Sequence, residues 1–146
     1  MVVEIVNRQT RRKLSRLRLK KTAQKVLELL NQERAELSLG LVGNRGIQKL
    51  NARYRNRNEP TDVLAFPAGK ALLPGMQVLG DVVISVEKAE EQARKRRKTL
   101  GQEIESLLIH GILHLLGYDH ERSEKDAKIM RRMEKKFIER FVGRGR

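Results

Sequence analysis

Cysteine and tryptophan are absent from this sequence, and only 3% of its 146 residues are aromatic. Without cysteine the chain has neither a disulfide framework nor a thiolate metal site, and its composition does not point to export. Because aromatic rings are few, surfaces on which nucleobases stack are scarce. A polyanion is therefore expected to be bound mainly through its backbone.

Long hydrophobic runs are absent as well. The longest uncharged apolar stretch, residues 106–118, is interrupted by His110 and His114 and is shorter than the roughly 20 residues that a membrane-spanning helix needs. The chain opens with a short apolar run that carries Glu4 and is followed, not preceded, by arginines, so no secretion signal is predicted. We therefore expect a cytoplasmic protein that makes no membrane contact.

Acidic residues are outnumbered. The chain has 32 Lys and Arg against 18 Asp and Glu, a formal net charge of +14, which is the electrostatic footprint of a nucleic-acid-binding protein. A charge-rich surface of the kind found in heat-stable proteins is the alternative, but it explains many charges of both signs rather than an excess of one. Between residues 8 and 21, eight of fourteen positions are Arg or Lys. This segment is predicted to be a solvated helix face from which Arg12, Lys13 and Arg16 contact phosphates.

The periodicity of apolar residues predicts a single α+β domain over residues 1–146. A chain of this length fits one domain, and no repeat, linker or low-complexity segment divides it. Four stretches have the apolar, β-branched character of strands, and the stretches between them have helical spacing. The expected strands are residues 2–6, 35–42, 61–66 and 79–86. The expected helices run from a cap at Thr10 to about residue 30, from a cap at Asn44 to residue 54, over 88–98 and 102–116, and from a cap at Ser123 to about residue 142.

All three histidines of the chain lie between positions 110 and 120. His110 and His114 are four residues apart on an expected core helix, so both rings leave the same face. Gly117 is placed to end that helix in a left-handed turn, which can return His120 toward the same face. Three imidazoles with open positions are the pattern of a catalytic zinc site, so we predict one Zn²⁺ per chain, with Ni²⁺ and Fe²⁺ as other ions that suit imidazole. The alternative, three core histidines bonded to carbonyl groups, needs three separate polar partners in an apolar core.

The histidine spacing is also that of the metzincin peptidases. Those enzymes carry a catalytic glutamate directly after the first histidine, where this sequence has Gly111. Without that carboxylate a peptidase would lack its general base. A zincin-like metallopeptidase is therefore kept only as an alternative function.

Three segments of the chain resemble the YbeY endoribonucleases, a family of ribosomal RNA maturation factors. They are residues 50–55 with 60–67 (LNxxYR and PTDVLxFP), residues 79–85 (LGDVVIS) and residues 110–120 (HGxLHLLGYDH). The resemblance implies a single zincin-like domain with a mixed sheet of about four strands packed with helices. It places the metal site on the buried core helix and the turn that follows. Ala65 departs from the pattern, because a serine is expected at that position.

The same resemblance implies a metal-dependent endoribonuclease that cuts single-stranded RNA in small-subunit ribosomal RNA processing and ribosome quality control. Its partners would be ribosomal RNA and the ribosome or small-subunit proteins. It implies that His110, His114 and His120 are the metal ligands and that Arg55 is the family's arginine near the metal. We take Arg55 and His114 as the candidate catalytic residues, with a metal-bound water as the expected nucleophile.

The chemistry of Arg55 fits this role independently, because a guanidinium offers paired donors to phosphate oxygens and stays charged at any working pH. Arg55 is equally well read as one of three arginines, with Arg53 and Arg57, at a basic helix end. Three aspartates can either accept hydrogen bonds from histidine rings or cap local turns: Asp62, Asp81 and Asp119. A metal-stabilised RNA-binding ribosome assembly factor with little catalysis is the second alternative function.

Overall fold

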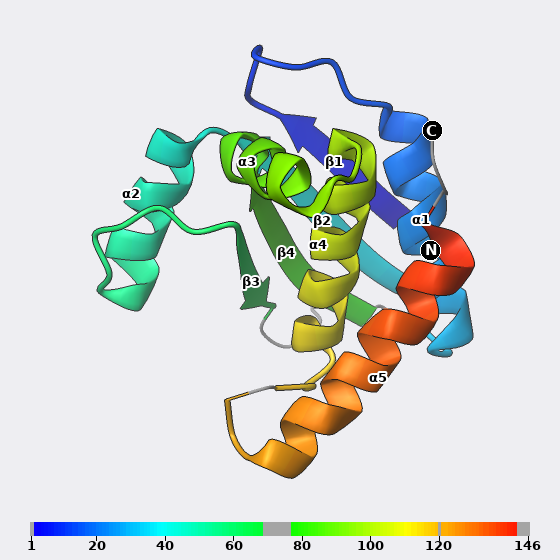
Figure 1. Ribbon diagram of the computed structural model, residues 1–146. Coiled ribbons are helices and arrows are strands. Elements are labelled where there is room, and N and C mark those ends of the chain that lie inside the picture. Colours follow the sequence, from blue (N-terminus) through cyan, green and yellow to red (C-terminus); the bar gives the residue numbers. More distant parts are fainter. Residues whose placement is uncertain (1, 69–76, 120, 143–146) are drawn as a thin grey trace.

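The computed structural model describes residues 2–68, 77–119 and 121–142. Within these ranges the chain forms a four-stranded sheet and five helices (Figure 1). The strands are β1 (Val2–Asn7), β2 (Ala35–Val42), β3 (Val63–Pro67) and β4 (Gln77–Ser85). The helices are α1 (Arg16–Leu29), α2 (Asn44–Arg55), α3 (Val86–Arg96), α4 (Leu100–Leu115) and α5 (Glu124–Phe141). No helix in the described ranges is long and apolar enough to cross a bilayer.

The sheet is mixed and has the strand order β1-β2-β4-β3. β1, β2 and β4 are mutually parallel, whereas β3 is an antiparallel edge strand on β4. Parallel neighbours require a crossover connection, and α1 supplies the one between β1 and β2. The predicted α+β class with a mixed sheet of about four strands is therefore confirmed.

The two faces of the sheet are covered by different helices. α1, α4 and α5 pack on one face over the main core, which includes Val82 and Ile84 of β4. α2 covers part of the other face through a smaller cluster of Ile47, Leu64 and Val83. In Figure 1, α4 crosses the front of the sheet while α2 stands apart at the left, beyond β3. The edge strand β3 consequently lies between the ends of α2 and α4.

Several expected helix starts are corrected. The cap of α1 lies five residues after Thr10, because the Ser15 side chain, not that of Thr10, accepts from a backbone N–H of the first turn. Gly43 is the cap position of α2, and the Asn44 backbone N–H instead donates to Glu87 Oε1 at 2.9 Å. α3 follows β4 without a loop, since the Ser85 hydroxyl caps it by accepting from Lys88 N–H at 3.2 Å. The caps at Thr99 and Ser123 follow the usual side-chain pattern.

α4 was expected to be a core helix in apolar surroundings, but its buried residues include two carboxylates. Glu103 and Glu105 are 0% and 1% exposed on this helix, and a buried carboxylate is costly unless it is paired. Arg96 reaches Glu103 at 2.9 Å, while Glu105 pairs with Arg18 and accepts from the Thr22 hydroxyl at 2.7 Å. These contacts join α4 to the end of α3 and to α1.

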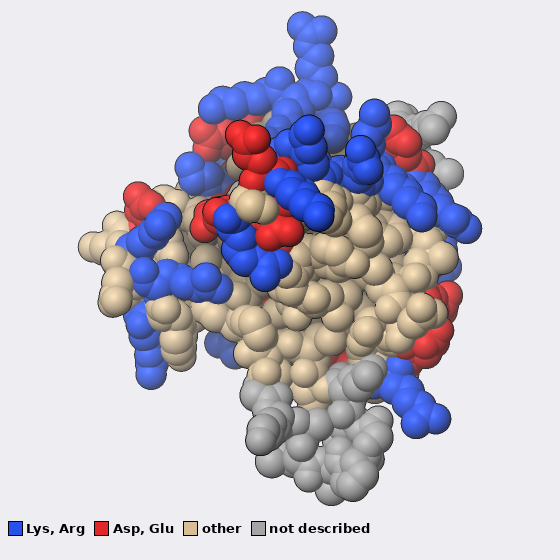
Figure 2. All heavy atoms as spheres, turned by 90° about the horizontal axis from the view of Figure 1, so that it is seen from below, with Lys and Arg blue, Asp and Glu red and all other residues tan. Residues whose placement is uncertain are grey.

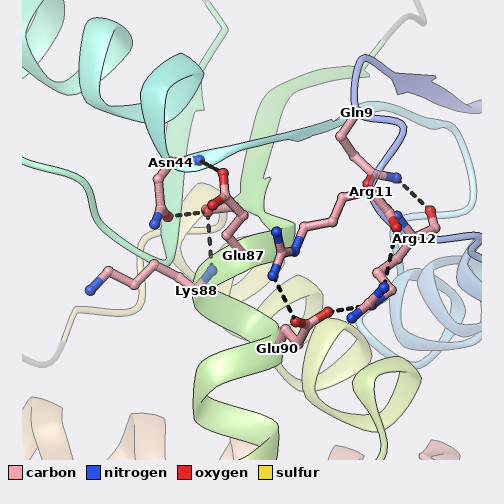
Figure 3. Close-up of polar contacts among 8 residues, drawn as sticks. Gln9, Arg11, Arg12, Asn44, Glu87, Lys88 and Glu90 are labelled. Atoms are coloured by element: carbon pink, nitrogen blue, oxygen red, sulfur yellow. Dashed lines mark hydrogen bonds and ion pairs between the residues drawn. The ribbon is translucent and has the colours of Figure 1, made fainter.

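A third carboxylate, Glu90 of α3, holds the loop between β1 and α1 (Figure 3). Arg11 Nη2 lies 3.2 Å from Glu90 Oε1, and Arg12 Nε pairs with Oε2. Three partly exposed arginines of the basic segment 8–21, Arg11, Arg12 and Arg18, are thus ion-paired to buried carboxylates. Arg12 therefore also has a structural contact, and phosphate contacts by Arg12, Lys13 and Arg16 remain a prediction.

Glu90 should give the stability of the fold a pH dependence. The hydrogen bond from Arg12 lowers the pKa of Glu90 below its usual value of 4.5 and outweighs burial, which raises it; Arg11 lowers it further. Because the folded pKa is the lower one, this stabilisation is complete above the unfolded pKa and is lost as pH falls through the folded pKa. Urea unfolding of wild type and Glu90→Gln should therefore show a stability difference that is largest near neutral pH and shrinks below about pH 4. Glu91→Gln, which removes a half-exposed carboxylate with only long ion pairs to Lys88 and Lys95, is the control. A difference between wild type and Glu90→Gln that is independent of pH would contradict the assignment.

Gly111 sits at the contact between α4 and β4. A Cβ atom at this position would lie 2.6 Å from Val82 Cγ1 and 2.9 Å from Cγ2. Val82 is fully buried and its β-branched side chain has little rotamer freedom. Any side chain at position 111, including the glutamate of the metzincins, would therefore force Val82 or the α4–β4 contact to shift.

Gly111→Ala should destabilise the protein by about 1–3 kcal/mol, the usual cost of overpacking a core. Gly101→Ala on the same helix is the matched control, because its Cβ would meet nothing closer than Thr99 Oγ1 at 4.0 Å, and it should stabilise by about 0.4–1 kcal/mol. Denaturant unfolding measures both. Equal effects of the two substitutions would show that α4 and β4 are not in close contact.

Candidate metal centre

A cleft of about 470 Å³ opens beside the end of α4. It is lined by Arg55, residues 61–65, His110, Gly111, His114, Asp119 and Glu121. Residues from two of the three YbeY-like segments, 50–67 and 110–120, thus meet in one cavity, and the third segment forms β4. The sheet explains this meeting, because β3 lies at its edge between the ends of α2 and α4.

His110 and His114 both line the cleft, with ring centroids 4.8 Å apart. α4 ends as predicted: Gly117 has φ +95°, and the Tyr118 backbone N–H donates to the Leu113 carbonyl at 3.1 Å. His120 lies outside the described residues. Among the residues that are described, no three His, Asp or Glu side chains converge as a metal cage. The third ligand therefore remains a prediction.

The imidazole of His110 is oriented by α5. Its Nδ1 contacts Glu134 Oε1, and both side chains are about three-quarters buried. In a neutral ring with Nδ1–H donating to this carboxylate, Nε2 is the nitrogen that can ligate an ion. Metal-ligating histidines usually have such a carboxylate on their other nitrogen. The residues present therefore fit an imidazole-bound divalent ion such as Zn²⁺.

Glu134 was not identified from the sequence, although a signal was available. The buried residues of α5 are Ala127, Met130 and Phe137, and Glu134 lies on the same stripe, four residues after Met130. A carboxylate on the apolar face of an amphipathic helix needs a partner in the core. The histidine on the neighbouring helix is that partner.

Arg55 is the last residue of α2, and Asn56 ends the helix in the left-handed region with φ 55°. The Arg55 Nη2 donates to the Ala65 carbonyl at 2.6 Å, and its guanidinium carbon lies 5.5 Å from the centre of the Phe66 ring. Of the arginines at this helix end, Arg53 lines a different groove and Arg55 lines the cleft. The side chain at position 65, where serine was expected, also lines the cleft.

The aspartates of the cleft make local bonds, and Asp62 Oδ2 also accepts from Gln92 Nε2 at 3.3 Å. Asp62 Oδ1 accepts from the Val63 backbone N–H at 2.8 Å, and Asp119 Oδ1 accepts from that of Glu121, also at 2.8 Å. These contacts are of the turn-capping kind. Asp62, Asp119 and Glu121 all line the cleft, whereas Asp81 is exposed on β4. Glu121 is a further cleft residue that sequence reasoning missed, because its position depends on the path of the chain after Gly117.

Known proteins are similar to this chain in sequence or in fold over most of its length. A relative named Endoribonuclease YbeY from Sulfurihydrogenibium sp. is 43% identical over 124 residues, covering 85% of this chain and 82% of the relative. One of the same name from Geobacter metallireducens is 41% identical over 147 residues, covering 97% and 95%. A solution structure of a Thermotoga maritima protein matches with a TM-score of 0.67 at 30% identity, covering 94% of this chain and 87% of that one.

The family model described as Endoribonuclease YbeY matches residues 4–142. It therefore spans the sheet, the cleft and α5, which carries Glu134. Together with relatives above 40% identity over most of their length, this match shows that the chain belongs to the YbeY family of endoribonucleases.

Proposed function

We propose that this chain is a metal-dependent endoribonuclease that cuts single-stranded RNA in the maturation of small-subunit ribosomal RNA. Membership of the family makes it a hydrolytic nuclease. The observation that carries the finer assignment is one cleft lined by the histidine pair of α4 and by Arg55. The net charge of +14 suits a polyanionic substrate. Such a substrate implies a cytoplasmic location and the ribosome or small-subunit proteins as neighbours.

The proposed metal ligands are His110, His114 and His120, with Zn²⁺ as the expected ion. When bound, a divalent ion supplies Lewis-acid stabilisation of negative charge on phosphate oxygens. The protein's own contribution is orientation: α4 presents two imidazoles from one face, and Glu134 holds the ring of His110. The turn at Gly117 leads the chain back toward that face.

Arg55 is proposed to bind the scissile phosphate through its guanidinium donors. The bond to the Ala65 carbonyl and the contact with Phe66 hold it at the cleft, so little ordering is needed when negative charge develops. Asp119 and Glu121 add carboxylates to the same cleft. A proton acceptor is therefore present although position 111 is glycine.

The peptidase alternative has no support in this geometry, because the packing of Gly111 against Val82 leaves no room for the glutamate on which such enzymes rely. The described elements share one main core built on a single sheet. We therefore propose that residues 1–146 act as one domain.

Removal of single ligands tests the metal centre. The purified protein should carry about one ion per chain, and His110→Ala or His120→Ala should lose most of it, because each leaves an incomplete ligand set. Glu134→Gln keeps every ligand but should weaken metal affinity roughly 10- to 100-fold. Elemental analysis and competition with a chelator measure these effects. Glu139→Gln, exposed on the same helix, is the control; metal content that is equally low in wild type and in the ligand variants would refute the site.

Substitution of Arg55 separates catalysis from binding. Arg55→Ala should lower the rate of RNA cleavage by roughly 10²- to 10³-fold, the usual effect of losing a donor to developing negative charge. Metal content should not change, and Arg55→Lys should recover only part of the rate because it loses the paired donors. Single-turnover cleavage and metal analysis measure both effects, with the exposed Arg57→Ala as control. If Arg55→Ala cuts at a near wild-type rate but binds RNA more weakly, Arg55 belongs to the general basic surface.

A further inference from the structure

Tyr54 stands out among the aromatic residues of the chain. The sequence has two tyrosines and three phenylalanines, and all five lie within the described ranges. Tyr54 alone is exposed, at 57%, whereas the other four are buried or half-buried. A single exposed ring is ordinary in itself, so the significance of Tyr54 depends on its neighbours.

Those neighbours connect Tyr54 to the cleft. Its ring meets that of Phe66 edge to face, with centroids 5.4 Å apart and an interplanar angle of 63°. Phe66 in turn contacts the guanidinium of Arg55 at 5.5 Å. The guanidinium carbon of Arg53 also lies 5.3 Å from the Tyr54 centroid. The two rings, Tyr54 and Phe66, are therefore flanked by a guanidinium at each end, and the Arg55 end lies at the cleft.

We propose that Tyr54, supported by Phe66, is the stacking platform for the nucleobase next to the phosphate that Arg55 binds. This proposal rests on the proposed function, because it names how the same cleft receives its RNA. A base can stack on an aromatic ring only when it is unpaired and splayed out. Since every base has a π face, such stacking tolerates any sequence. The platform therefore favours single-stranded RNA without selecting its sequence.

A second groove continues the path from Tyr54 along α2. It has a volume of about 520 Å³ and is lined by Arg45, Gln48, Lys49, Ala52, Arg53 and Asn58. Arg45, Lys49 and Arg53 are spaced four residues apart, so they share one face of α2. None of the residues described as lining this groove is acidic. Figure 2 shows Lys and Arg near the left margin of the molecule, the side on which α2 lies.

This charge arrangement suits the phosphates of the nucleotides that follow the stacked base. Arg53 connects the groove to the platform, because it lines the groove and contacts the Tyr54 ring. A strand leaving the cleft would therefore pass from Arg55 over the platform and onto a row of three cations. The few aromatic residues of the chain do not prevent base stacking, because one exposed ring lies beside the reactive phosphate.

An abasic substrate tests the platform. An RNA oligonucleotide with one mapped cleavage site is compared with versions that lack the base on either side of the cut. In one of the two positions, loss of the base should lower both the affinity and kcat/KM of wild type about 5- to 150-fold, the range for one stacked base. Tyr54→Ala should show this loss with the intact RNA and no further loss with that abasic RNA.

Three variants exclude a merely structural role. Tyr54→Phe keeps a stacking ring and should behave as wild type, whereas Tyr54→Leu keeps an apolar contact with Phe66 and should behave as Tyr54→Ala. Leu17→Ala removes a side chain that is 64% exposed on α1 and should change nothing. If wild type does not distinguish intact from abasic RNA, or if Tyr54→Ala loses equally on both, the platform is wrong.

The groove and the activity are tested separately. Arg45→Gln with Lys49→Gln should reduce the slope of log affinity against log salt by about 1.4, at about 0.7 per phosphate contact on single strands. The control variant Lys128→Gln with Arg131→Gln, exposed on α5, should leave the slope unchanged. An unchanged slope in the α2 variant would show that the RNA does not follow the groove.

The platform and the nuclease function can fail independently. Wild type that binds intact RNA more tightly than abasic RNA but cuts neither would refute the nuclease function and leave the platform standing. Wild type that cuts intact and abasic RNA equally would refute the platform and leave the nuclease function standing.

Discussion

The close contact between α4 and β4 is the constraint on which the site depends. Val82 lies where a side chain at position 111 would be, so α4 rests directly on the sheet. This contact fixes the helix along its whole length, because the buried residues of α4 run from its first turn to Leu113. His110 and His114 flank the contact point, and their rings are therefore held by backbone packing instead of by flexible loops. A rigid base for the imidazoles is what a metal site requires.

Carboxylates in the core hold the other elements to this helix. Glu103 and Glu105 of α4 pair with Arg96 and Arg18, and Glu134 of α5 contacts His110. A buried pair adds little net stability, but breaking it leaves one charge uncompensated. The pairs therefore specify which helix ends meet α4 more than they stabilise the fold. The Arg96–Glu103 and Arg18–Glu105 pairs are each neutral, so the formal net charge of +14 is left to the rest of the chain.

Much of the fold follows from local patterns. The approximate strand positions, a core helix that carries His110 and His114, and the left-handed turn at Gly117 were predicted correctly, because apolar periodicity and glycine geometry act over a few residues. Helix starts were less accurate, since several side chains can cap and only tertiary contacts choose among them, as with Ser15 over Thr10. Glu134 could not be paired with His110 from the sequence, because they lie 24 residues apart on helices whose crossing is set by packing. The proximity of Arg55 to the histidines could not be predicted either, because it too depends on how distant elements pack.

Because β3 is an edge strand, the side chain of Arg55 can reach the cleft. The outer side of an edge strand has backbone groups that no neighbouring strand satisfies. Arg55 donates to one of them, the Ala65 carbonyl, so the bond that positions the guanidinium also covers part of the sheet edge. A strand on the outer side of β3 would occupy that carbonyl and separate α2 from the cleft. The short antiparallel edge strand therefore creates the space in which an arginine from one face of the sheet meets the histidines from the other.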